Sequence, residues 1–163
     1  MGISTNILSE KDVKYLRQAI NVSGEARKHG NHPFGCVIVD EHDKEVTITE
    51  NRVPSADATQ HAELCAVSTI TKIRDAESLL KCTLYSSTEP CAMCFGAIFW
   101  SGIGRIVFGF SNANLVRLAQ LNPKNFYLRV SSKEIAKSAS RPIEVLGPFL
   151  EDEAAIPHSH YWD

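Results

Sequence analysis

The spacing of apolar residues predicts that helices and strands alternate along the chain. Ser9 and Asp12 match a capping pair for an amphipathic helix that runs to about Lys28. Residues 34–39 form a nearly continuous apolar run, which is typical of a buried strand. The segment 46–49 alternates more regularly, so we expect it to return as the partner strand of a hairpin.

The central part of the chain continues this alternation. We expect a helix, a strand, a second helix and a second strand over residues 60–74, 79–86, 90–101 and 105–110. Thr59 or Asp57 is the expected N-cap of the first of these helices, which would start near Gln60. Pro90 suits the first helical position of the second one.

The last third of the chain gives shorter segments. Helices are predicted over residues 112–121, 132–139 and 148–155, with a strand over 143–146. A hairpin followed by alternating helices and strands indicates an α/β domain with a mostly parallel sheet covered on both faces. Right-handed crossovers would then place the helices of residues 60–74 and 90–101 on one side, with their N-termini at one edge. The length of 163 residues fits a single domain, residues 1–163.

Charge and composition limit the range of partners. The net charge is −2, and acidic and basic residues are scattered, so the basic stripe of a polyanion-binding protein is missing. No apolar run is long enough to predict a membrane span, and Met1–Asn6 lacks the features of a secretory signal. We therefore expect a soluble, cytoplasmic protein that acts on a small molecule.

Four residues carry the candidate chemistry. His61, Cys91 and Cys94 supply three zinc ligands, and Glu63 follows the histidine by two positions. Structural zinc takes four protein ligands, whereas catalytic zinc takes three and leaves one position to water. The pattern therefore predicts a catalytic zinc site in which Glu63 moves protons beside the metal.

This arrangement resembles the cytidine deaminase superfamily, whose signature is H-x-E followed by P-C-x-x-C. His61, Glu63, Pro90, Cys91 and Cys94 match the signature in full. The resemblance implies a three-layer α/β/α sandwich around a five-stranded mixed sheet, with the fifth strand parallel. It also implies one zinc ion per chain, hydrolytic deamination with Glu63 as the catalytic group, and a homodimer whose interface includes the helix that follows Cys94.

Candidate substrate contacts follow from the same resemblance. Asn51 stands where these enzymes place a substrate-contacting asparagine, although it also reads as a turn residue after a strand. The backbone at Ala62 is expected to meet the substrate edge. Phe34 could stack on a base or belong to the core. Tyr161-Trp162 resembles the aromatic tails that close over the base in relatives; the alternative is a disordered chain end. The remaining histidines are interpreted as surface or turn residues: His29, His32, His42, His158 and His160.

The substrate itself is less well determined by the sequence. We expect a free nucleobase or nucleoside, with a purine such as guanine slightly ahead of cytosine. The loop 111–115 lacks the features that tRNA adenosine deaminases carry there. It also lacks the acidic residue of bacterial guanine deaminases, for which Glu151, Asp152 or Glu153 could substitute. A tRNA-specific adenosine deaminase and a non-catalytic, zinc-stabilised subunit remain the alternatives. Binding of tRNA would favour the first, and the absence of any deaminase activity would favour the second.

Overall fold

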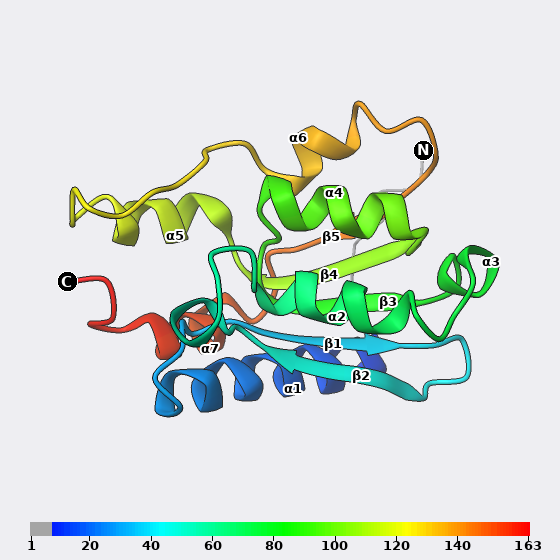
Figure 1. The fold of residues 1–163 in the computed structure, drawn as a ribbon, viewed down its shortest axis with the longest axis horizontal. Coiled ribbons are helices and arrows are strands. Elements are labelled where there is room, and N and C mark those ends of the chain that lie inside the picture. The colour runs from blue at the N-terminus through cyan, green and yellow to red at the C-terminus, as the bar shows by residue number, and fades with distance from the viewer. Residues whose placement is uncertain (1–7) are drawn as a thin grey trace.

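A computed structural model describes residues 8–163, so the expectation for Met1–Asn6 lies outside the described residues. The fold is built on one five-stranded sheet with the order β2-β1-β3-β4-β5 (Figure 1). The strands are β1 Gly35–Val39, β2 Glu45–Glu50, β3 Thr83–Thr88, β4 Arg105–Phe110 and β5 Glu144–Leu146.

The sheet is mixed, as predicted. β1 pairs antiparallel with β2 on one side and with β3 on the other. β3, β4 and β5 are mutually parallel. The hairpin and the parallel fifth strand are therefore both confirmed.

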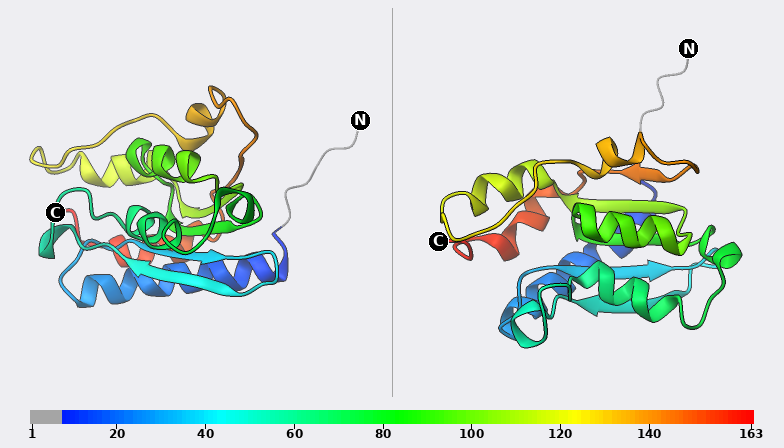
Figure 2. Two further views of the ribbon diagram at one scale, coloured as in Figure 1. Left: turned by 45° about the vertical axis from the view of Figure 1, so that its right-hand side comes forward. Right: turned by 45° about the horizontal axis from the view of Figure 1, so that its top comes forward.

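Helices cover both faces of this sheet. The longest is α1 Glu10–Lys28, which lies on one face together with α7 Glu151–Ala155, whereas α2 Ala62–Ile70 and α4 Ala92–Ser101 lie on the other face (Figures 1 and 2). The shorter elements are α3 Ala76–Leu79, α5 Asn112–Ala119, α6 Ser132–Ala136 and two 3-10 turns, η1 Val53–Ser55 and η2 Ile156–His158. This is the three-layer sandwich that the resemblance implied.

Strand alternation explains why there are two cores. Successive side chains of a strand point to opposite faces, so Leu84 and Ile106 pack under α2 and α4 while Tyr85 and Val107 pack under α1. The helix α1 begins where the sequence predicted, with the Ser9 hydroxyl accepting a hydrogen bond from the Asp12 N–H at 3.1 Å.

Several predicted boundaries were wrong, and local hydrogen bonds explain the first of them. Asp57 accepts from the Thr59 N–H at 2.8 Å and closes a turn of its own, so α2 begins only at Ala62. That helix ends at Ile70 instead of near residue 74. Leu79 ends α3, and β3 therefore starts at Thr83.

The second metal-site helix also starts later than predicted. Cys91 is the N-cap of α4, so Pro90 precedes the helix and does not occupy its first turn. None of the helices within residues 8–163 combines the length and the apolar character needed to cross a bilayer.

Candidate metal centre and active site

His61 and Glu63 reach a common point because His61 is not part of the helix. His61 has extended backbone angles and is the N-cap of α2, and Glu63 lies in the first turn. Side chains two positions apart would point roughly 200° apart in a helix interior. At the helix entrance this restriction does not apply, so the imidazole and the carboxyl can both face the end of the helix.

Cys91 and Cys94 occupy the opening turn of the neighbouring helix. Cys91 is the N-cap of α4 and Cys94 follows within the first turn, and α2 and α4 pack side by side. The ligand atoms of His61, Cys91 and Cys94 all lie within 4.8 Å of one another, and no second such cluster of three occurs within the described chain.

The spacing of these atoms fits a zinc ion. Cys91 Sγ and His61 Nδ1 are 3.6 Å apart, and tetrahedral zinc with ordinary Zn–S and Zn–N bonds separates such atoms by about 3.5 Å. Two sulfurs and one imidazole nitrogen are also a donor set that suits zinc. The residues present can therefore hold the metal with three protein ligands.

The electrostatics of the cluster favour a cation. A hydrogen bond from Cys94 and a second one with His61 lower the pKa of Cys91 to about 4. The pKa of Cys94 is raised by the same hydrogen bond with Cys91, by burial and by the neighbouring Glu63 carboxylate. These opposite pKa shifts favour a thiolate at Cys91 and a thiol at Cys94, whose proton a bound cation would displace.

Glu63 is buried beside the cluster and has one fixed partner. Its Oε1 accepts a hydrogen bond from the Ser86 hydroxyl at 2.7 Å. Burial raises the pKa of Glu63 above its usual value, which suits a group that must both accept and return a proton. Sequence reasoning missed Ser86, because a single hydroxyl within a buried strand gives no signal until the strand is placed under α2.

Asn51 presents a hydrogen-bond donor that the protein leaves without a partner. Its side-chain Oδ1 accepts a hydrogen bond from the Val53 N–H at 2.9 Å, and its backbone N–H donates to the Phe34 carbonyl oxygen at 3.1 Å. Its Nδ2 is the one buried side-chain nitrogen or oxygen in residues 8–163 that lacks a hydrogen-bond partner. A buried amide without a partner is costly, so this NH₂ group is a strong candidate for a ligand contact.

Ala62 supplies a second free donor. It is the first residue of α2, where an N–H has no partner within the helix. Its carbonyl oxygen is held by the Thr49 hydroxyl at 2.7 Å, which anchors the start of α2 to β2. The structure thus fixes the backbone between His61 and Glu63 in place.

The C-terminal segment packs against Phe34. The centroids of the Phe34 and Trp162 rings are 6.0 Å apart, and Phe34 also meets the ring of His158 edge-on. His158 was predicted as a surface or turn residue; it does lie in the 3-10 turn η2, but it is only 1% exposed and is therefore not on the surface. His32 is also partly covered, since its ring packs against Tyr161 and Trp162.

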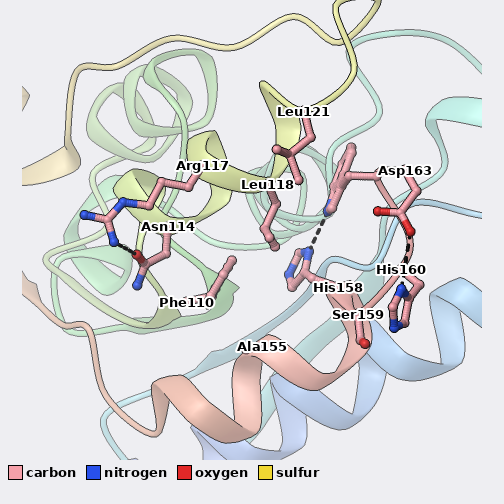
Figure 3. Close-up of a pocket in the computed structure, with 11 residues that line it drawn as sticks. Phe110, Asn114, Arg117, Leu118, Leu121, Ala155, His158, Ser159, His160 and Asp163 are labelled. Carbon is pink, nitrogen blue, oxygen red and sulfur yellow. Dashed lines mark hydrogen bonds and ion pairs between the residues drawn. The ribbon is translucent and has the colours of Figure 1, made fainter.

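A cavity of about 460 Å³ lies between α5 and this C-terminal segment (Figure 3). His158 and Trp162 belong to its wall, together with Phe110 and Asn114. The three metal-ligating residues do not line it. We place the chemistry at the metal cluster, because that is where the ligand set and the Glu63 carboxyl group are found.

Glu151 does lie at the loop where an acidic substitute was conjectured. Its Oε1 accepts from the Ser111 N–H at 2.9 Å, from the Ser111 hydroxyl at 2.6 Å and from Asn114 Nδ2 at 2.8 Å. These bonds give Glu151 the role of tying α7 to the start of α5.

Comparison with known proteins agrees with this geometry. Residues 9–110 match the family model for the cytidine and deoxycytidylate deaminase zinc-binding region. The chain is 58% identical to a probable cytosine deaminase of Schizosaccharomyces pombe over 99% of this chain and 98% of that protein. It is 37% identical to the tRNA-specific adenosine deaminase of Haemophilus influenzae over 67% of this chain and 64% of that protein.

A solved structure shares the fold. The guanine deaminase from Nitrosomonas europaea superposes with a TM-score of 0.75 at 22% identity, covering 93% of this chain and 83% of that one. At 22% identity, this similarity shows a shared fold and does not show a shared substrate. The expected order of substrates, with a purine ahead of cytosine, is therefore not supported, because the relative that matches over its full length is a probable cytosine deaminase.

The matched zinc-binding region, the full-length similarity and the cluster of His61, Cys91 and Cys94 together show that the chain belongs to the cytidine and deoxycytidylate deaminase family and is a hydrolytic deaminase acting on C–N bonds.

Proposed function

We propose that the protein deaminates free cytosine, taking cytosine and water to uracil and ammonia. The observation that carries the chemistry is the convergence of His61, Cys91 and Cys94 with a buried carboxyl, Glu63, beside them. The choice of cytosine is supported by the 58% identity to a probable cytosine deaminase along nearly the whole chain.

His61, Cys91 and Cys94 would hold one zinc ion per chain, and zinc supplies the Lewis acidity that brings the pKa of water towards neutrality. Glu63 accepts a proton from the attacking water and delivers it to the ring nitrogen next to the amine-bearing carbon. It then takes the proton of the hydroxyl group added to that carbon and transfers it to the amine, so that the carbonyl group forms as the C–N bond breaks and ammonia leaves. The Ser86 hydroxyl holds one oxygen of Glu63 in place during these transfers.

Recognition of the base would use two hydrogen-bond donors, one on Asn51 and one on Ala62. The Asn51 Nδ2 group and the Ala62 N–H are both hydrogen-bond donors that match the ring carbonyl oxygen of cytosine. Phe34 and Trp162 supply aromatic faces against which a planar base can pack. The net charge of −2 favours such a small substrate over tRNA.

The test is ammonia release from cytosine by the zinc-loaded protein, with cytidine, guanine, guanosine, adenine, adenosine and tRNA as competing substrates. Glu63→Gln is expected to retain one zinc per chain and to lose at least about 100-fold in kcat. Glu45→Gln, at an exposed position on β2, is the matched control and should keep full activity.

Three results would contradict the proposal. Turnover by Glu63→Gln would remove Glu63 from the chemistry, and release of ammonia only from tRNA or a purine would replace the substrate. Zinc bound with no turnover of any substrate would favour a non-catalytic subunit.

We also propose that the protein is a homodimer that pairs through α4. Trp100 at the end of this helix is 85% exposed, and Phe126 and Leu128 on the segment after α5 are 100% and 61% exposed. Exposed apolar side chains of this size mark interaction surfaces. Light scattering should give twice the chain mass for the wild type, and Trp100→Lys should shift the mass towards the monomer; a monomeric wild type would refute the proposal.

A further inference from the structure

His158 holds an unusual position for a residue so near the end of the chain. It ends η2, and its ring is buried between the end of β3 and Trp162. Its Nε2 lies 3.2 Å from the Thr88 hydroxyl. Its Nδ1 accepts a hydrogen bond from Trp162 Nε1 at 3.2 Å, which is the dashed line at His158 in Figure 3. The Phe110 ring stacks on it with centroids 4.9 Å apart.

These contacts fix the protonation state of the imidazole. An indole N–H can only donate, so Nδ1 of His158 must be the unprotonated acceptor. The single ring proton is therefore on Nε2, where it donates to Thr88. Burial lowers the pKa of His158 to about 4, which keeps the ring neutral at physiological pH.

The result is one hydrogen-bonded unit made of Thr88, His158 and Trp162. The planes of the imidazole and indole rings are nearly parallel, with an angle of 15° between them. Thr88 ends β3, three residues before Cys91, so one end of the unit is attached to the strand that leads into the metal site. At the other end, Trp162 meets Phe34, whose carbonyl oxygen binds Asn51.

Other contacts hold the chain around this unit without setting the indole orientation. Arg27 donates to the carbonyl oxygens of Pro157 and Ser159 at 2.8 and 2.7 Å, and the Tyr161 hydroxyl is bonded to His32. These bonds retain the segment on α1. Within residues 8–163, the bond to His158 is the one hydrogen bond that the Trp162 side chain makes.

We propose that His158 is a positioning residue that orients Trp162 against the base-binding side of the active site. The inference rests on the proposed deaminase function and adds to it a residue that sequence reasoning had interpreted as a surface or turn residue. His158 acts through Trp162 and contacts neither the metal cluster nor, in this proposal, the substrate.

The two ring nitrogens can be tested separately by amide side chains. His158→Asn keeps an acceptor near the Nδ1 position and can still bind Trp162, whereas His158→Gln keeps a group near the Nε2 position and reaches only Thr88. His158→Phe keeps an aromatic ring and loses both bonds. His160→Asn is the matched control, because the His160 side chain is exposed and is bonded only to Asp163.

The KM for cytosine should rise about fivefold in His158→Gln and His158→Phe, the effect of one lost hydrogen bond of about 1 kcal/mol. It should stay within about twofold of the wild type in His158→Asn and in the His160 control, with kcat little changed throughout. An equal rise in all three His158 variants, or no rise in His158→Phe, would overturn the proposal.

A second measurement needs no substrate and so separates this proposal from the proposed function. The chain has two tryptophans, and Trp100→Phe leaves Trp162 as the sole emitter. In that background, His158→Gln and His158→Phe should shift the emission of Trp162 to longer wavelength, and His158→Asn should not. Unchanged emission in all variants would refute the positioning role, whereas a shift without any cytosine turnover would refute only the assigned substrate.

Discussion

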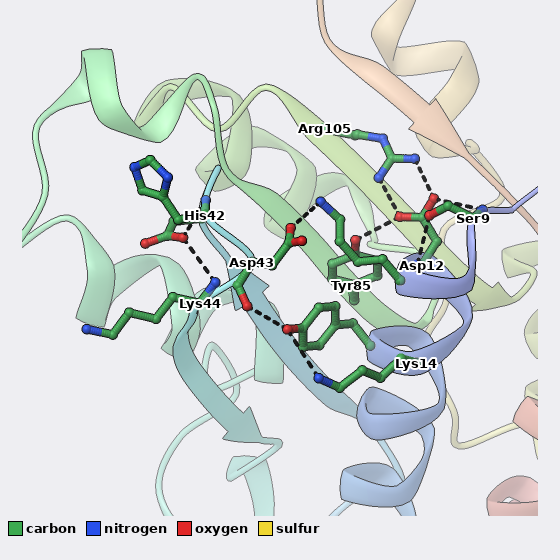
Figure 4. A network of polar contacts seen from close by, with 11 residues as sticks. Ser9, Asp12, Lys14, His42, Asp43, Lys44, Tyr85 and Arg105 are labelled. Carbon is green, nitrogen blue, oxygen red and sulfur yellow. Dashed lines mark hydrogen bonds and ion pairs between the residues drawn. The ribbon is translucent and has the colours of Figure 1, made fainter.

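Replacing Asp12 by Asn should destabilise the fold at the end of the sheet remote from the metal cluster. Asp12 is buried and accepts from Arg105 Nη1 and Nη2 at 2.7 and 3.0 Å and from the Tyr85 hydroxyl at 2.7 Å (Figure 4). These bonds join the start of α1 to β3 and β4. An Asn side chain would turn its NH₂ group towards one of these donors and leave Arg105 without its buried counter-charge.

The size of the effect follows from these contacts. Removing one partner of a buried ion pair costs about 3–5 kcal/mol. Arg105 keeps a bond to Glu144 at 2.8 Å and is a quarter exposed, so we expect about 3 kcal/mol, at the lower end. For a domain of this size that corresponds to a fall in Tm of roughly 6–12 °C.

The pH dependence has a definite sign. Burial alone would raise the pKa of Asp12, but hydrogen bonds from Arg105, Tyr85 and Ser9 hold it well below its usual value. Because the pKa of Asp12 is lower in the folded state, its carboxylate stabilises the protein when the pH is above about 3.9, the pKa of Asp in the unfolded chain. This stabilisation is lost as the pH falls below that value. The difference between wild type and Asp12→Asn should therefore be full at pH 7 and shrink below about pH 4.

Urea unfolding followed by circular dichroism measures the effect. Glu10→Gln, an exposed acidic residue in the same first turn, is the control and should change the free energy of unfolding by less than about 0.5 kcal/mol. The folded Asp12→Asn variant should retain the wild-type kcat. A loss of less than about 1 kcal/mol would refute the reasoning, because it would mean that the ion pair contributes no more than an exposed one.

Three further predictions test other parts of the fold. Glu89→Gln should lower the free energy of unfolding by about 2 kcal/mol. The buried carboxylate of Glu89 accepts 2.8 Å bonds from the first N–H groups of both α5 and α6, whereas an amide has only one acceptor oxygen. An unchanged urea midpoint would contradict this prediction. Gly35→Ala should cost about 1–3 kcal/mol, because the added Cβ would meet the carbonyl oxygen of Ala19; a variant as stable as the wild type would show that α1 moves freely away from β1. Burial lowers the pKa of His158 to about 4 in the folded protein, compared with about 6.5 in the unfolded chain. The neutral ring therefore stabilises the fold fully above about pH 6.5, and up to about 3 kcal/mol of this stability is lost as the pH falls towards 4. Wild type should therefore lose more stability than His158→Phe between pH 7 and pH 4.5, as measured by Tm, and parallel curves would refute the assignment.

The sequence by itself determined the chemistry and the fold class. His61, Glu63, Cys91 and Cys94 could be identified from residue type and spacing, because a metal site needs particular donor atoms and short helix-entrance motifs supply them locally. The order of the strands and of the longer helices could also be predicted, although the short helix α3 was missed. The periodicity of apolar residues is a local property, and the capping pair Ser9 and Asp12 marks a helix start within four residues.

Only the tertiary structure decided which polar groups lie beside that chemistry. Ser86, Thr88 and His158 come from a strand interior, a strand end and the last residues of the chain, and their roles depend on contacts between segments up to 70 residues apart. The unpaired Nδ2 of Asn51 likewise becomes visible only when every neighbouring donor and acceptor is placed. A pattern read along the chain records which groups are present, whereas burial and hydrogen-bond partners depend on how distant segments pack. This is why a histidine predicted as a surface or turn residue is found in the interior.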